Sequence, residues 1–241
     1  MIRILGIAGS LRADSYNRQL LRLAAENLPD GVEFAVWEGL RDVPAYDVDD
    51  ESTPSIAVAG FRSAVAAADA VLIATPEYNG SIPGALKNAL DWGSRPQATN
   101  PFRGKPVAVI GASPGAFGGV WAHAETRKVL GLMGARVVDA ELSLGKAQDR
   151  LAEPDDDLLE QLRATVDLLV GEAIPAPSLR REGGGRDGVS RARRPAESRS
   201  RRSLLVRQRR RSRREAPAAG ARGHARRRRR PPNQPTRQGA A

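Results

Sequence analysis

The sequence contains no cysteine, and this absence excludes several kinds of chemistry at once. Disulfide bonds, thiolate nucleophiles, iron–sulfur clusters and cysteine-bound zinc all need a residue that the chain does not have. Only two histidines are present, which is too few for a metal site built from several imidazoles. A chain without cysteine fits a reducing compartment, and we expect a cytoplasmic protein.

Long apolar stretches are also missing. In the sequence of 241 residues, no apolar run approaches the length of roughly 20 residues that a helix needs to cross a bilayer. The apolar start, residues 1–7, is too short for a signal peptide and leads directly into glycines, so it predicts a buried strand instead. We therefore expect a protein that is neither exported nor bound to a membrane.

The net charge of +10 averages over two parts of opposite sign. Residues 1–177 hold 16 Lys and Arg against 24 Asp and Glu, a net charge of −8. Residues 178–241 hold 22 Arg, no Lys and four acidic residues, a net charge of +18. This low-complexity, self-repelling composition predicts a disordered basic tail over residues 174–241.

Three interpretations of the tail stay open. It could bind nucleic acid through phosphate electrostatics, although the lack of aromatic residues in 178–241 argues against base stacking. It could have no function. It could also come from an out-of-frame reading of a GC-rich gene, because it contains arginine without lysine, mixed with Pro, Ala and Gly.

Residues 1–173 alternate short apolar runs with segments of helical periodicity, and we interpret them as one domain. The pattern predicts strands at residues 2–8, 32–37, 70–74, 106–111 and 136–138. It predicts a loop at residues 38–55 and helices at residues 17–28, 56–68, 84–92, 119–133 and 156–170. Five alternating strands and helices predict an α/β, flavodoxin-like three-layer sandwich with a five-stranded parallel sheet of order 2-1-3-4-5. Ligands of such sheets bind beyond the carboxyl ends of the strands, where the strand order reverses.

The loop after the first predicted strand has the composition of an anion site. Residues 9–18 read GSLRADSYNR and join a buried strand to a helix N-terminus, where main-chain N–H groups converge. They offer two hydroxyls, one amide and two guanidinium groups, from Ser10, Ser15, Asn17, Arg12 and Arg18. Neither a dinucleotide fingerprint nor a P-loop is present, so the loop indicates a site for one phosphate. An N-terminal cap with incidental serines is the alternative.

Two later loops have the composition of a ring-binding surface. Residues 75–84 read TPEYNGSIPG, in which Asn79-Gly80 predicts a tight turn with positive φ. Tyr78 is a candidate to stack on a ligand or line a pocket. Residues 111–119 read GASPGAFGG, and four glycines leave an open backbone that can wrap a planar ligand. Taken alone, each loop also fits an ordinary strand-to-helix turn.

Three motifs recur together in one known family. They are GSLRxxSxN at residues 9–17, PEYNGSxPGxLKNxLDW at residues 76–92 and the glycine-rich stretch that ends at Gly118-Gly119. With them, residues 1–173 resemble the NADPH-dependent FMN reductase family, which includes quinone, azo-dye and chromate reductases. The resemblance implies bound FMN, NADPH or NADH as co-substrate, and ping-pong hydride transfer to a small-molecule electron acceptor. That acceptor could be a quinone, an azo compound, chromate or free flavin.

The resemblance also implies which residues contact FMN. Its phosphate would be held by Ser10, Arg12, Ser15, Asn17 and Arg18. Its ring would be bordered by Pro76, Glu77, Tyr78, Asn79, Gly80 and Ser81. The other edge of the ring would meet Ser113, Gly115 and Gly118. Because FMN carries the redox chemistry, no catalytic side chain and no metal site is predicted.

The chain departs from the family pattern on the helix after Gly118-Gly119. Many relatives carry a basic residue and then a glutamine there, whereas this chain has Trp121 and His123. The departure bears on nucleotide preference and on oligomer contacts, because the family places this helix near the subunit interface. We interpret His123 as a histidine on the surface of that helix.

One face of the predicted helix 84–92 is apolar. This face consists of Leu86, Ala89, Leu90 and Trp92. Core packing is one explanation of it. The resemblance adds a role as a dimer helix, so we expect a homodimer or tetramer. Two other functions stay open. One is a flavodoxin-type electron carrier, and the other is a nucleic-acid-associated protein that binds through its Arg-rich tail.

Overall fold

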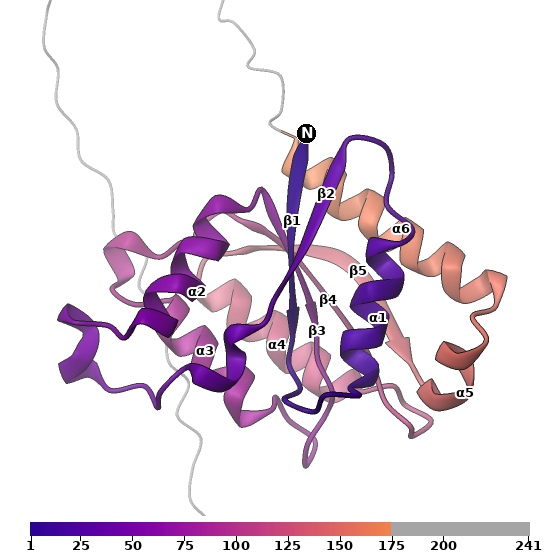
Figure 1. Cartoon of the computed structure of the whole chain (residues 1–241), viewed down its shortest axis with the longest axis horizontal. Coiled ribbons are helices and arrows are strands. Elements are labelled where there is room, and N and C mark those ends of the chain that lie inside the picture. Colours follow the sequence, from indigo (N-terminus) through magenta and orange to yellow (C-terminus); the bar gives the residue numbers. More distant parts are fainter. Residues whose placement is uncertain (175–241) are drawn as a thin grey trace, which may run out of the picture. The chain divides into compact units, whose positions relative to one another are not determined.

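A computed structural model describes residues 1–174, and the Arg-rich tail with its predicted disorder lies outside the described residues. The described part is built around a five-stranded parallel sheet of order β2-β1-β3-β4-β5 (Figure 1). Its strands are β1 (Ile2–Ala8), β2 (Val32–Trp37), β3 (Ala70–Ala74), β4 (Pro106–Ala112) and β5 (Arg136–Leu144). The predicted strand order is confirmed.

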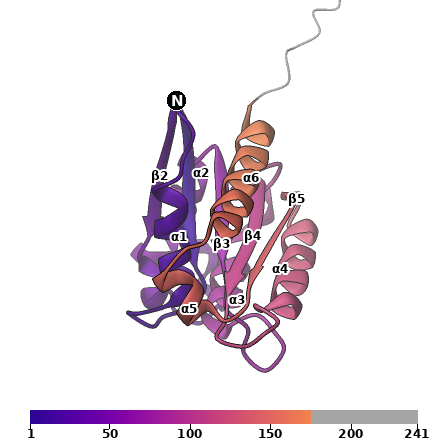
Figure 2. The same ribbon diagram turned by 90° about the vertical axis from the view of Figure 1, so that its right-hand side faces the viewer.

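Helices cover both faces of the sheet and make three layers, which the view in Figure 2 shows. On one face, α1 (Tyr16–Ala25) and α6 (Asp156–Ala173) pack their leucines against the sheet. On the other face lie α2 (Ile56–Ala67), α3 (Gly84–Gly93) and α4 (Val120–Leu132). The flavodoxin-like sandwich is therefore confirmed.

The two central strands explain why apolar runs predicted the sheet. In β3, Leu72 joins the core beneath α1 and α6, while Val71 and Ile73 join the core beneath α2 and α3. Every residue of β3 and β4 is buried, because side chains of successive residues point to opposite faces and both faces are covered.

Three predictions about individual elements need correction. β5 extends to Leu144 instead of residue 138, because it is an edge strand whose outward residues are exposed and break the apolar run. A short helix that was not predicted, α5 (Ala147–Ala152), follows it, so the described residues contain six α-helices and not five. The predicted loop at 38–55 contains two short 3₁₀ helices, η1 (Gly39–Asp42) and η2 (Val48–Ser52).

The ends of the helices follow the local sequence. Asp155 caps α6 by accepting a hydrogen bond from the Leu158 N–H at 2.8 Å, as expected for a carboxylate at a helix start. Within residues 1–174, no helix is both long enough and apolar enough to span a bilayer.

Candidate functional site

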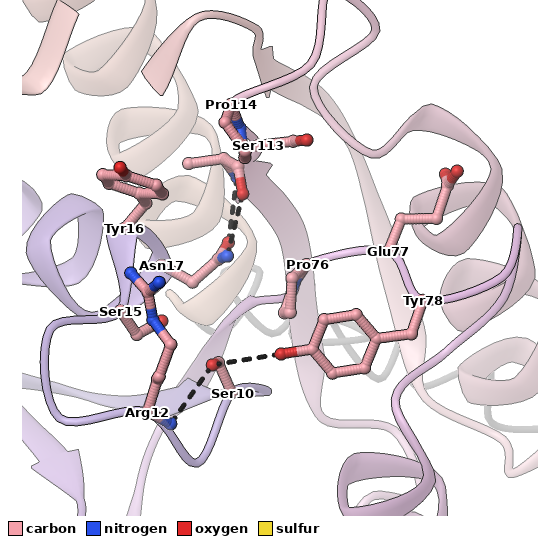
Figure 3. A pocket seen from close by; sticks show the side chains of 11 residues that line it. Ser10, Arg12, Ser15, Tyr16, Asn17, Pro76, Glu77, Tyr78, Ser113 and Pro114 are labelled. Atoms are coloured by element: carbon pink, nitrogen blue, oxygen red, sulfur yellow. Dashed lines mark hydrogen bonds between the residues drawn. The ribbon is translucent and has the colours of Figure 1, made fainter. Parts of the chain in front are cut away.

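A cavity of about 330 Å³ opens at the carboxyl ends of β1, β3 and β4 (Figure 3). β1 and β3 are neighbours in the sheet although β2 lies between them in the sequence, so the cavity lies where the strand order reverses. Eight of the predicted site residues line it: Ser10, Arg12, Ser15, Asn17, Pro76, Glu77, Tyr78 and Ser113. Three further lining residues were not predicted, and all come from the same loops: Tyr16, Ala112 and Pro114.

The wall formed by the first loop combines buried hydroxyls with a helix N-terminus. Ser10 and Ser15 are only 5% and 2% exposed. Ser15 is the N-cap residue of α1, yet its hydroxyl makes no capping hydrogen bond. Because the first N–H groups of a helix have no intrahelical acceptor, this end of α1 combines unused donors with a buried hydroxyl. Such an arrangement suits an anionic group.

Asn17 has a structural task within the cavity wall. Its Nδ2 donates to the Ala112 carbonyl oxygen and its Oδ1 accepts from the Ala112 N–H, both at 2.9 Å. The side chain therefore joins the start of α1 to the end of β4, two segments that are 95 residues apart.

The two arginines of the first loop occupy different places. Arg12 is exposed at the cavity, where its Nη2 donates to the Asp14 carbonyl oxygen at 2.6 Å and its guanidinium carbon lies 5.4 Å from the centre of the Tyr16 ring. Arg18 does not line the cavity and forms an ion pair with Glu38. The Arg18 Nε atom is buried and has no hydrogen-bond partner among the described residues.

The second loop forms a tight hairpin that directs Tyr78 into the cavity. Asn79 and Gly80 have φ values of 54° and 72°, as predicted for this turn. Tyr78 and Ser81 exchange two main-chain hydrogen bonds of 3.1 Å across it. The Tyr78 hydroxyl then reaches the Ser10 hydroxyl at 3.4 Å, so these two side chains meet across the cavity (Figure 3). Asn79, Gly80 and Ser81 themselves lie outside the lining.

Glu77 connects this hairpin to α4. Its Oε2 accepts hydrogen bonds from the N–H groups of Trp121 at 3.1 Å and Ala122 at 3.2 Å. The N-cap residue of α4 is Gly119, which has no side chain, so Glu77 supplies the missing cap from another loop. No local pattern could reveal this contact, because the partners are 44 residues apart.

The expectation that His123 lies on a helix surface is wrong. Its side chain is 4% exposed, with Nε2 3.1 Å from the Thr75 carbonyl oxygen and Nδ1 2.8 Å from Ser143 Oγ. A carbonyl only accepts, so Nε2 carries the hydrogen and Nδ1 accepts from the Ser143 hydroxyl. Burial lowers the pKa of His123 below its ordinary value of 6.5. The imidazole therefore joins the end of β3 to β5 as a neutral group.

The glycines of the third loop make room for this packing. A methyl group on Gly111 would collide with the His123 ring, and one on Gly118 would collide with the main chain of Ser143. Gly118 and Gly115 do not line the cavity, while Ser113, which does, accepts a hydrogen bond from the Gly115 N–H at 3.1 Å.

Comparisons with known proteins agree with this arrangement. The sequence model of the NADPH-dependent FMN reductases matches residues 2–149. A quinone reductase of Pseudomonas putida is 44% identical over 125 residues, which are 52% of this chain and 67% of the relative. A quinone reductase of Escherichia coli K12 is 33% identical over 175 residues, which are 71% of this chain and 91% of the relative.

A solved structure supports the same assignment. FerB, a flavoenzyme NAD(P)H:(acceptor) oxidoreductase from Paracoccus denitrificans, matches with a TM-score of 0.62 and 30% identity, over 71% of this chain and 99% of FerB. These comparisons do not favour an electron carrier or a nucleic-acid-associated protein. The protein is an oxidoreductase with FMN as its cofactor and NAD(P)H as its electron donor. By its fold and by these matches, the chain belongs to the NADPH-dependent FMN reductase family.

Proposed function

We propose that the cavity is the FMN site and that the enzyme reduces a quinone-type acceptor with NAD(P)H. The acceptor class follows the relatives from P. putida and E. coli, which are quinone reductases. In the overall reaction, NAD(P)H gives up a hydride, which is two electrons and one proton. Solvent supplies a second proton, so that the quinone becomes a hydroquinone and NAD(P)⁺ leaves. Bound FMN supplies a ring that can be reduced by the donor and reoxidised by the acceptor.

The observation that carries the proposal is the uncapped start of α1. The buried hydroxyl of Ser15 and the first N–H groups of the helix are donors that no described side chain uses in capping. Ser10 adds a second buried hydroxyl and Arg12 a positive charge. A phosphate monoester needs such donors, and a helix N-terminus stabilises its charge. In this proposal Asn17 acts by holding Ala112 in place, and Arg18 acts from behind the wall.

The ring half of FMN is assigned to the part of the cavity that the second and third loops line. Pro76, Tyr78, Ser113 and Pro114 form walls there with few charged groups, which suits a flat ring system. Five predicted residues outside the lining shape these walls through the main chain: Asn79, Gly80 and Ser81 through the hairpin, and Gly115 and Gly118 through the loop after Ser113.

A comparison of FMN with riboflavin, which lacks the phosphate, tests the assignment. We expect Ser15→Ala to weaken FMN binding about ten- to a hundredfold, because a hydrogen bond to a charged group contributes about 1.5–3 kcal/mol. Riboflavin binding should not change. Ser55→Ala is the matched control, because Ser55 is the N-cap of α2 but its hydroxyl already accepts from the Val58 N–H.

The measurement is titration of the apoprotein with each flavin, followed by flavin fluorescence. Equal affinity of the wild-type protein for FMN and riboflavin would remove the phosphate site from the cavity. A fall in the affinity of Ser15→Ala for both flavins would point to a general loss of structure.

The proposal extends to domain limits, assembly and location. We assign the FMN domain to residues 1–173, the remainder to a separate tail, and the protein to the cytoplasm. We also propose a homodimer or tetramer, to be tested by sedimentation equilibrium at micromolar concentration. The apolar residues on which the sequence based a dimer helix are buried within the monomer: Leu86, Ala89, Leu90 and Trp92. A partner subunit would therefore contact other residues of α3.

A further inference from the structure

An exposed aromatic pair lies at the start of α4. Phe117 is 65% exposed and Trp121 is 54% exposed. Their ring centroids are 5.3 Å apart and the rings are tilted by 58°. Val120, between them in the sequence, is also partly exposed, as is Tyr78 in the cavity wall. A contiguous patch of exposed apolar side chains marks an interaction site, whereas singly exposed apolar residues are common on any protein surface.

The pair is attached directly to the cavity. Glu77 lines the cavity and accepts a hydrogen bond from the Trp121 N–H at 3.1 Å. Between the two aromatic residues, Gly118 and Gly119 hold left-handed conformations with φ values of 64° and 98°. Gly118 packs closely against the main chain of Ser143. The backbone that presents the two rings is therefore held in place beside Glu77, a residue of the cavity lining.

The charges around the pair limit what can bind there. Residues 113–126 contain no lysine or arginine, and neither do residues 75–86 of the facing hairpin. The carboxylates in this region, Glu77 and Glu125, already accept hydrogen bonds from the start of α4 and from the Ser81 hydroxyl. These two segments offer no cation to the two phosphates of a dinucleotide, and the nearby Lys146, whose N–H donates to the Gly115 carbonyl oxygen, lies exposed on a neighbouring loop. An uncharged flat molecule needs no such partner.

We propose that Phe117 and Trp121 form the platform on which an uncharged aromatic electron acceptor, such as a quinone, docks before reduction. The proposal rests on the FMN site proposed above and adds the residues that select the acceptor. Aromatic rings stabilise one another through offset or edge-to-face contacts, and such a contact corresponds to about a two- to tenfold change in affinity.

Steady-state kinetics with two acceptors test the platform. One acceptor is 2-methyl-1,4-naphthoquinone, and the other is ferricyanide, which has no aromatic ring. We expect Trp121→Ala and Phe117→Ala each to raise the KM for the naphthoquinone about three- to tenfold. The KM for ferricyanide, the KM for NADH and the FMN content should not change. Leu132→Ala is the matched control, since Leu132 is an exposed apolar residue at the other end of α4.

Tryptophan fluorescence of the holoenzyme provides a readout that does not depend on activity. The chain has three tryptophans, and of these Trp121 is exposed, Trp37 is half-buried and Trp92 is buried. Saturable quenching by the naphthoquinone is therefore expected in the wild-type protein and lost in Trp121→Phe. Because phenylalanine keeps a ring on the platform, the KM of Trp121→Phe should stay within about twofold of the wild-type value.

The outcomes separate this inference from the proposed function. An unchanged naphthoquinone KM in both alanine variants, with normal ferricyanide turnover, would overturn the platform and leave the FMN reductase intact. Dissociation of an oligomer in Trp121→Ala would overturn it too, because the pair would then be a contact between copies of the chain. If the protein failed to bind FMN, the proposed function would be wrong. If the protein bound FMN but the naphthoquinone caused no saturable quenching, the platform alone would be wrong.

Discussion

Replacing His123 with glutamine is expected to remove a pH dependence from the stability of the protein. The imidazole is buried and neutral, with Nε2–H donating to Thr75 and Nδ1 accepting from Ser143. Desolvation lowers its pKa, and Arg127 adds to this shift. The hydrogen bond to the Thr75 carbonyl and the carboxylates of Glu77 and Glu141 partly oppose it. Glutamine is neutral at all relevant pH values and can still donate to the Thr75 carbonyl.

The sign and size follow from proton linkage. A histidine whose pKa is lowered by folding binds its proton more readily in the unfolded state. Well above pH 6.5, the ordinary pKa of histidine, its protonation does not affect the free energy of unfolding. As the pH falls from 6.5 towards the lowered pKa of the folded state, the free energy of unfolding decreases. One proton changes the free energy of unfolding by at most about 1.4 kcal/mol per pH unit. The slope of the free energy of unfolding against pH should therefore be steeper in the wild-type protein than in His123→Gln by up to this amount.

Urea unfolding of the apoprotein at half-unit steps between about pH 5 and pH 8 measures this difference. Carboxylates and His224 are shared by both proteins, so their contributions cancel in the comparison of slopes. The absolute stability of the variant does not enter the argument. Parallel curves for the two proteins, or a wild-type protein that becomes more stable relative to the variant on acidification, would refute the buried neutral histidine.

Two further predictions concern the contacts that hold the cavity walls. Glu77→Ala removes both acceptor contacts at the start of α4 and should lower the free energy of unfolding by about 0.5–2 kcal/mol in urea titrations, and Glu77→Gln by less, since it keeps an amide oxygen. Equal losses would contradict the capping role. Asn17→Ala leaves the N–H and carbonyl groups of Ala112 unpaired and should cost about 3 kcal/mol. Asn17→Asp should recover part of this by accepting from the Ala112 N–H, and a loss below about 1 kcal/mol in the alanine variant would show that water replaces the side chain.

The sequence was sufficient where the structure depends on neighbours along the chain. The apolar runs of β3 and β4 are visible because both faces of these strands are covered. The turn at Asn79-Gly80 and the cap at Asp155 depend on residue types within a few positions. The three loops meet at one edge of the sheet because parallel strands end on the same side, which the alternation of strands and helices predicts.

The misses have a common physical cause. The second half of β5 was missed because Asp139 and Glu141 point to solvent from an edge strand and interrupt its apolar pattern. His123 was placed on the surface because its polar partners come from distant parts of the chain, Thr75 from the loop after β3 and Ser143 from β5. Contacts over such separations leave no periodicity in the sequence, so only the folded arrangement shows which polar residues serve the interior.

The double attachment of the Tyr78 hairpin has a consequence for how quickly the site can be entered. Glu77 joins the hairpin to the start of α4, and the Ser81 hydroxyl joins it again through Glu125 at 2.6 Å. Hinge motion of the hairpin would have to break both attachments together. The Tyr78 side chain can still rotate away from Ser10 without breaking either attachment, a movement of picoseconds to nanoseconds for a residue this exposed.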